Sequence, residues 1–365
     1  MFVALNYSVL FIAFLCIDKI TKYKYMLSYI FLAICCIILM AANFYNADYA
    51  GYEMFYYNNT DYGEFFYQEL ARYFSSHGFS YQKFKLITSI LFLLNLFYII
   101  SLLVPKTIRT YVLGLYMMFP FFFDVIVVRN FMGNIFFMYA FVFFISEKKY
   151  KYYASFFFMA LAIGFHSLYI IYLPFFLIPF IKSCQLLRRI LYILIIIAFV
   201  IAVGGDIIKI LSPLLLSYSN NLKIVRVLLY EARAKAGVMI FLFFTFTPLF
   251  FIWKYWKFYT RTQRKPKYSK FQYLSTNFLP YVYYANIILL LYLPLIVLQS
   301  NFYRIYANIA ILNSIALLMA ATDKHYYFRK ATCIGIGSIY ILRACMSLYV
   351  YKDVFSHNYI ISYLL

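Results

Sequence analysis

Four residues that can carry positive charge, Arg129, His166, Arg304 and Arg343, interrupt strongly apolar stretches of the chain, and Asp124 lies five residues before the first of them. A charged side chain at membrane depth is costly and therefore marks a functional candidate. Guanidinium groups match phosphate oxygens in bidentate fashion, so arginines that face one wet cavity favour diphosphate binding. A carboxylate in an adjacent loop suits the deprotonation of a sugar hydroxyl.

Each of these residues also has a simpler interpretation. An arginine at the membrane boundary can extend to lipid phosphate. A histidine near the end of a span is often a structural hydrogen-bonding group, and Arg343 fits a helix partner of an acid. Asp61 and Glu64 fit a capping box, with Asp61 as the N-cap and Glu64 at position N3. The functional interpretation therefore depends on the collective pattern.

The composition defines the elements that must position these residues. Hydrophobic residues make up 66% of the 365 residues and charged residues 12%, whereas a soluble domain has about 45–50% and about 25%. The sequence therefore predicts an all-α polytopic membrane protein, a single integral membrane domain over residues 1–365. Apolar stretches between polar breaks predict about twelve spans: 2–17, 26–44, 84–104, 111–128, 131–146, 152–165, 167–181, 189–204, 237–253, 279–298, 305–321 and 332–350. The pairs around Arg129 and His166 are so closely spaced that either fits a broken or re-entrant element.

The basic residues predict the orientation. The polar breaks between successive spans must alternate between the two sides of the membrane. On one side they carry 21 of the 33 lysines and arginines but only three of the 12 acids. The positive-inside rule makes that side cytoplasmic, and it includes the basic loop 254–270. Both termini then face outward. A net charge of +21 is explained by topology, so no nucleic-acid partner is expected.

Two long segments are predicted on the outer side, 45–83 and 205–236. In the first, Phe66, Leu70 and Phe74 recur at helical spacing with Tyr73, and Gly78 follows as a C-cap. This pattern predicts an amphipathic helix on the outer membrane surface. The second segment resembles a helical lid.

Several kinds of chemistry lack their signatures in this chain. There is no paired-Asp nucleotide-sugar motif, P-loop, HExxH or GxSxG motif, and none of the six cysteines forms a CxxC pair. We therefore expect neither a metal nor another cofactor. The functions that remain are chemistry on lipid-linked substrates at the outer side of the membrane, and transport.

Four stretches together resemble the EpsG-like and Wzy-type polysaccharide polymerases. The segment from Asn46 through Asp48, Tyr49 and Tyr52 resembles the family's N-x-D-Y-x-x-Y element, which precedes a Glu, here Glu64, and an aromatic-rich helix. The start of VVRNFMGN is similar to the family's I-R-Q element, with Asn130 in place of Gln. IGFHSLY resembles its F-H-x-S/T element, and NFYRIYAN its late Arg helix.

The resemblance implies a GT-C-like, metal-independent glycosyltransferase of the bacterial inner membrane. Its substrate would be oligosaccharide linked to undecaprenyl diphosphate, joined on the periplasmic face, with membrane lipid and a chain-length regulator as partners. Arg129 and Arg304 would hold the donor diphosphate, and His166 would hydrogen-bond the diphosphate or the sugar. Asp48 or Glu64 would orient or deprotonate the acceptor hydroxyl, and Tyr49 and Tyr52 would bind the glycan.

Three alternatives remain open. A polymer-to-lipid ligase shares the donor and much of the architecture. A sugar O-acetyltransferase is a second alternative. A lipid-linked oligosaccharide flippase fits the span count, but the outward termini and the absence of a visible half-chain repeat disfavour it. The sequence leaves the sugars, the new linkage and the final product (O-antigen, capsule or exopolysaccharide) undetermined.

Overall fold

The computed structural model describes residues 26–44, 46, 48–58, 64–204, 235–262, 272–298 and 300–350. These residues are helical and contain no β-strand. They form two compact units. Within the described ranges, unit 1 comprises the chain up to Ile170, residues 272–278 and the chain from Ala310, and unit 2 comprises 171–262 and 279–309.

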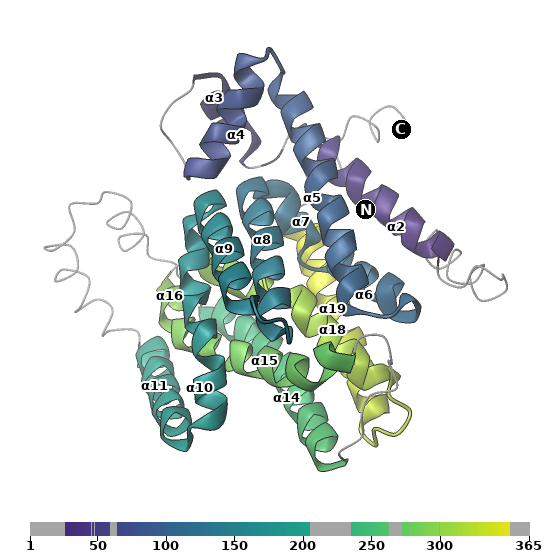
Figure 1. Cartoon of the computed structure of the whole chain (residues 1–365), viewed down its shortest axis with the longest axis vertical. Coiled ribbons are helices and arrows are strands. Elements are labelled where there is room, and N and C mark those ends of the chain that lie inside the picture. Colours follow the sequence, from purple (N-terminus) through teal and green to yellow (C-terminus); the bar gives the residue numbers. More distant parts are fainter. Residues whose placement is uncertain are drawn as a thin grey trace, which may run out of the picture. The chain divides into compact units, whose positions relative to one another are not determined.

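Unit 1 consists largely of the first half of the chain with the last two helices (Figure 1). Its helices are α2 (Met26–Ala41), α3 (Tyr49–Asn58), α4 (Phe65–Ser76), α5 (Tyr81–Leu103), α6 (Lys106–Met118), α7 (Phe121–Ile126), α8 (Val128–Ile145), α9 (Lys151–Phe165), α18 (Ala310–Thr322) and α19 (Arg329–Val350).

Unit 2 combines α-helices with short 3-10 segments. It contains α10 (Ile178–Ser183), α11 (Gln185–Gly204), α14 (Lys235–Thr262), η2 (Leu290–Tyr292), α16 (Leu293–Leu298), η3 (Ser300–Tyr303) and α17 (Arg304–Ala307). The 3-10 helix η1 (Ser167–Leu177) and α15 (Gln272–Leu289) each pass from one unit to the other.

The membrane prediction has support in the length and apolarity of the helices. Within the part of the chain that the structure describes, four stretches are long and apolar enough to cross a membrane: Tyr81–Leu103, Val128–Ile145, Gln185–Ala202 and Asn277–Val297. Four shorter apolar helices accompany them. The number of twelve spans and the GT-C-like architecture stay predictions, and the expected span 2–17 and most of 205–236 lie outside the described residues.

Four predicted spans are not single continuous α-helices. The prediction of one helix over 111–128 was wrong, because α6 ends at Met118 and α7 begins after Pro120, which lacks the N–H that a continuing helix needs. The span predicted over 279–298 consists of the end of α15, η2 and α16, and that over 305–321 is interrupted between α17 and α18. The span predicted over 167–181 is mostly 3-10 helix, and at 11 residues η1 is long for this geometry.

Aromatic stacking joins α8 and α9 into a hairpin. Phe136 stacks on Phe165 with ring centroids 5.1 Å apart, and Phe143 stacks on Phe158 at 5.3 Å. In contrast, Leu91 and Leu94 of α5 are more than half exposed. An apolar face that no protein covers suits contact with lipid, so these helices combine an aromatic interior with lipid-compatible outer faces.

Basic side chains satisfy carbonyl groups at the ends of two helices. Arg109 donates to the carbonyls of Ser101 and Val104 at the end of α5. Arg329 donates to the Ala321 carbonyl at the end of α18. The last carbonyls of a helix lack internal partners and carry partial negative charge, so these arginines stabilise the helix ends.

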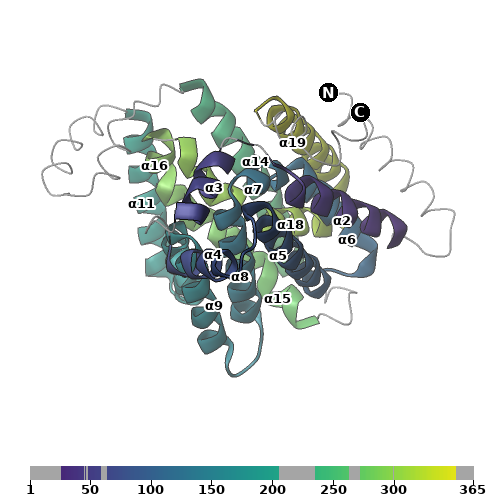
Figure 2. The ribbon, with the colours of Figure 1, turned by 90° about the horizontal axis from the view of Figure 1, so that it is seen from above.

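The segment between α2 and α5 forms a helical pair, α3 and α4, beside the first turn of α5 (Figures 1 and 2). The helix expected around Phe66 and Phe74 is α4, and Gly78 follows it with a φ of 74°. Its apolar face, however, packs on protein: Phe66 contacts Phe165 of α9, and Phe74 contacts Phe84 of α5. The placement of this helix along the outer membrane surface stays a prediction.

Candidate functional site

One end of unit 1 gathers segments that are far apart in sequence. The beginnings of α5 and α8 and the end of α9 meet there, and α4 packs against α5 and α9. Tyr56 of α3 donates to the Phe79 carbonyl, and the Tyr57 hydroxyl accepts from the Tyr81 amide, so α3 is tied to the first turn of α5. This end carries most of the predicted site residues.

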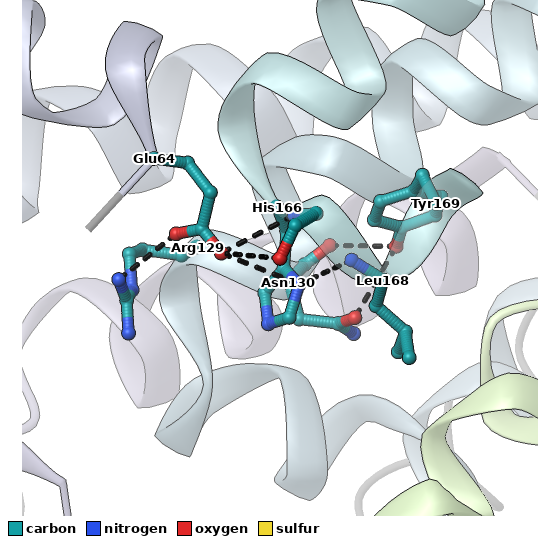
Figure 3. A network of polar contacts seen from close by, with 7 residues as sticks. Glu64, Arg129, Asn130, His166, Leu168 and Tyr169 are labelled. Carbon is teal, nitrogen blue, oxygen red and sulfur yellow. Dashed lines mark hydrogen bonds and ion pairs between the residues drawn. The ribbon is translucent and has the colours of Figure 1, made fainter. Parts of the chain in front are cut away.

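Glu64 is the centre of the polar network at this end (Figure 3). Its Oε2 lies 2.9 Å from a guanidinium nitrogen of Arg129, and its Oε1 accepts from the Ser167 amide at 3.2 Å and the Ser167 hydroxyl at 3.1 Å. The His166 Nδ1 lies 3.9 Å from the same Oε1. The structure thus brings three of the predicted residues, Glu64, Arg129 and His166, into one cluster.

The capping-box alternative for Glu64 was wrong. The residue occupies the N-cap position of α4 rather than N3, and its side chain makes no capping hydrogen bond. Both carboxylate oxygens point to other elements instead. Asp61 lies outside the described residues.

Arg129 lies at the beginning of α8 between two tyrosine rings. Its guanidinium carbon is 5.1 Å from the centre of the Tyr52 ring and 5.7 Å from that of Tyr67. Its Nε is buried and has no hydrogen-bond partner among the described residues. Tyr52 therefore lies beside the cation, and its role in binding substrate stays a prediction.

His166 separates α9 from η1 and has a defined ring orientation. Its Nδ1 accepts from the Leu168 amide at 3.2 Å, which places the proton of the neutral ring on Nε2. The next turn is fixed by Tyr169, which is fully buried and donates to the Asn130 carbonyl at 2.8 Å. This bond joins the element that carries His166 to the first turn of α8.

The electrostatics of the cluster keep Glu64 ionised. Burial by itself would raise the pKa of this carboxyl, but Arg129, His166 and the Ser167 backbone N–H together hold the pKa below its ordinary value of 4.5. The Glu64 carboxylate is therefore a charged hydrogen-bond acceptor at neutral pH.

A buried lysine that sequence reasoning missed fixes the segment before α3. Lys85, only 1% exposed, donates to the carbonyl of Asn43 at 2.5 Å and to its Oδ1 at 3.3 Å, and its Nζ lies 5.2 Å from the Tyr49 ring centre. Asn43 Oδ1 also accepts from Asn46, whose own Oδ1 accepts from the Asp48 amide. The sequence contained a signal for this residue, because a charged lysine lies inside a predicted span.

The remaining predicted residues lie at other positions. The Asp48 carboxylate makes no hydrogen bond to another described residue, and Tyr49 donates to Gln82 at 3.1 Å. Arg304 begins α17 and belongs to unit 2.

Two further candidates, Asp124 and Arg343, lie away from the cluster but within unit 1. Asp124 is buried and accepts from the Tyr116 hydroxyl at 2.9 Å. Arg343 contacts the Phe119 ring at 4.5 Å and the Tyr340 ring at 5.5 Å, so aromatic rings cover its charge.

The described residues contain no group of three or more His, Cys, Asp or Glu side chains that could hold a metal ion. What they do contain is a carboxylate, a guanidinium and an imidazole at one end of a bundle of apolar helices, the arrangement of a helical membrane protein with a polar site. The chain belongs to the EpsG family, whose model matches residues 26–365. This family suggests a role in polysaccharide polymerisation, in agreement with the resemblance of the motifs. No match was found among curated proteins or among solved structures.

Proposed function

We propose that this chain polymerises oligosaccharide repeat units linked to undecaprenyl diphosphate, on the periplasmic face of the bacterial inner membrane. The bond between the glycan and the donor diphosphate breaks, and the anomeric carbon bonds to a hydroxyl oxygen of the next lipid-linked unit. The acceptor hydroxyl loses its proton, and the lipid diphosphate leaves as an anion. The reaction is that of a metal-independent glycosyltransferase.

One observation carries the proposal: Glu64, Arg129, His166 and Ser167 converge from three separate segments at one end of a helical bundle. These residues supply what the reaction needs, a fixed cation for the leaving diphosphate and an ionised carboxylate for the acceptor hydroxyl.

The contacts suggest how the roles divide. Arg129 gives one N–H to Glu64, and its guanidinium carries further N–H groups whose planar geometry matches phosphate oxygens. The His166 Nε2–H supplies a second donor for the diphosphate or the sugar. Glu64 orients or deprotonates the acceptor hydroxyl, with Asp48 as the other carboxylate in the same outer segment. The buried rings of Tyr52 and Tyr67 flank Arg129 and fix the position of its guanidinium.

Arg304 is proposed as a second cation for the same diphosphate. Its position at the beginning of a one-turn helix favours this role, because irregular backbone at membrane depth accompanies binding sites.

The experiment is polymerisation by the purified protein, supplied with repeat units on undecaprenyl diphosphate and with EDTA, without any nucleotide. We expect a ladder of product lengths. A requirement for Mg²⁺ or for nucleotide-sugar would contradict the proposal. A single transfer to a different lipid acceptor would favour a ligase, and movement of intact lipid-linked units across the membrane without a new glycosidic bond would favour a flippase.

A further inference from the structure

Two irregular stretches of backbone in unit 2 are joined by tyrosine hydroxyls. One is η1, and the other runs through η2, α16, η3 and α17 over 290–309. Such backbone is stable in a membrane protein only where its freed N–H and C=O groups find partners within the protein. The side chains that supply these partners therefore determine how the stretches are held.

Tyr172 of η1 supplies one such partner at the Arg304 turn. Its hydroxyl donates to the Ile305 carbonyl at 2.7 Å, and both residues are fully buried. Because α17 ends at Ala307, this carbonyl belongs to a turn that lacks a continuing helix. The side chain of Asn308 hydrogen-bonds with the same hydroxyl, and the Asn308 amide donates to the Arg304 carbonyl at 2.9 Å.

We infer that Tyr172 is a positioning residue for Arg304, because its hydroxyl holds the Arg304 turn on η1. The inference rests on the proposed function, in which Arg304 binds the donor diphosphate. It extends that function to a residue that makes no proposed contact with the substrate. The 3-10 helix that carries Tyr172 begins at Ser167, the residue that binds Glu64.

The chain offers a matched control for this role. Tyr292 of η2 donates to the Ile171 carbonyl at 3.1 Å. This bond also joins the two irregular stretches through a tyrosine hydroxyl, but it lies outside the Arg304 turn. Tyr292→Phe therefore removes the same kind of bond as Tyr172→Phe without releasing Ile305.

The test measures how well undecaprenyl diphosphate, the leaving group, inhibits polymerisation by full-length protein in detergent. We expect Tyr172→Phe to raise the inhibition constant and the KM for the donor by about tenfold, the factor that corresponds to 1.4 kcal/mol, with a smaller change in kcat. Tyr292→Phe should change neither the inhibition constant nor the KM by more than about twofold. In an Arg304→Lys background, Tyr172→Phe should add little, because residues that act as one unit are not additive. Asn308→Ala provides a second way to loosen the turn if Tyr172→Phe does not accumulate, and it should give the same pattern.

If Arg304→Lys itself binds diphosphate more weakly than the wild type does, three results would overturn the inference. These are a wild-type inhibition constant in Tyr172→Phe, equal losses in Tyr172→Phe and Tyr292→Phe, and fully additive losses with Arg304→Lys. If Arg304→Lys binds the lipid diphosphate as well as the wild type does, the proposed role of Arg304 itself fails, and the positioning role fails with it.

Discussion

At the scale of single residues, the environment of Glu64 decides what its carboxylate can do. The residue is polar, partly buried and bonded to three groups from two other elements, so its charge is balanced by protein rather than by water. Burying an ion pair costs desolvation energy, and removing one partner leaves an uncompensated charge. A partly buried pair of this kind therefore favours a functional role for Glu64.

Replacing Glu64 by Gln removes the charge while keeping the size of the side chain. We expect the rate of polymer formation to fall by at least about 100-fold, the scale on which a general base contributes. Glu69→Gln is the matched control, because Glu69 lies on the same helix and pairs with Arg72 at 2.6 Å on the exposed surface. Polymer ladders from equal amounts of protein compare the two, and equal losses would argue against a special role for Glu64.

The lowered pKa of Glu64 also predicts a pH dependence of stability. The folded-state pKa lies below the ordinary value of 4.5, so the ion pair with Arg129 stabilises the fold above that pH and is lost as the pH falls through the lowered value. Thermal midpoints should show the wild type above Glu64→Gln at neutral pH, with the gap closing in acid. A gap that is constant or grows as the pH falls would contradict this assignment.

A further prediction concerns Lys85, the buried residue that fixes the segment before α3. Lys85→Met removes both hydrogen bonds that Lys85 donates to Asn43, which costs about 1–3 kcal/mol. We expect a lower melting temperature and a loss of activity, because Asn43 supports the turn that leads to Tyr49. Lys83→Met, two residues away and exposed, should behave as the wild type. Equal melting temperatures in both variants would contradict the role assigned to Lys85.

Sequence reasoning at this scale identified the residue types better than their partners. The spacing of apolar runs made Arg129 and His166 conspicuous, because charge within such runs is rare. Which groups meet depends on long-range packing that periodicity does not encode, so the contacts from Glu64 to Arg129 and Ser167 required the fold. Lys85 was missed because its position near the end of a predicted span resembles that of an ordinary boundary lysine.

At the scale of elements, two glycines allow the helices around the site to approach closely. A Cβ on Gly133 would meet the ring of Tyr169, and a Cβ on Gly164 would meet the ring of Phe66. The first contact packs η1 on α8, and the second packs α4 on α9. The absence of a side chain at these two positions therefore sets the distances between the elements that carry the cluster.

We predict that Gly164→Ala separates α4 from α9 and lowers stability by about 1–3 kcal/mol, the usual cost of overpacking. Gly337→Ala in α19 is the control, since its Cβ would meet nothing within 4 Å. There alanine should be neutral or stabilising by up to about 1 kcal/mol. Melting temperatures in one detergent compare the two, and an unchanged Gly164→Ala protein would contradict the packing described.

Element boundaries were predictable where caps or prolines mark them. The end of α4 near Gly78 follows such a signal. The interruptions around η1 and α17 left only weak signals, because a 3-10 segment and an α-helix share the same apolar composition. Their stability comes from tertiary hydrogen bonds such as that of Tyr172, which local sequence does not reveal.

At the scale of the whole molecule, the distribution of basic residues predicts the orientation in the membrane. After all six native cysteines are replaced by Ser, a single cysteine at position 58 should react with a membrane-impermeant reagent added from outside. A cysteine at position 149 should react only after the membrane is opened, because Lys149 belongs to a basic break on the predicted cytoplasmic side. The reverse labelling would move the cluster to the cytoplasmic face and end the proposed periplasmic chemistry.

The most direct measurement for the central claim is the initial rate of ladder formation by purified wild-type, Arg129→Ala and Arg129→Lys proteins on the same lipid-diphosphate-linked repeat units. If Arg129 binds the leaving diphosphate, the Ala variant should form no polymer, and the Lys variant should recover only part of the rate, because lysine keeps the charge but loses the planar fork. All three proteins should insert in the membrane and purify equally. A wild-type ladder from Arg129→Ala, or full activity in Arg129→Lys, would contradict the assignment of the reaction to the Glu64–Arg129 cluster.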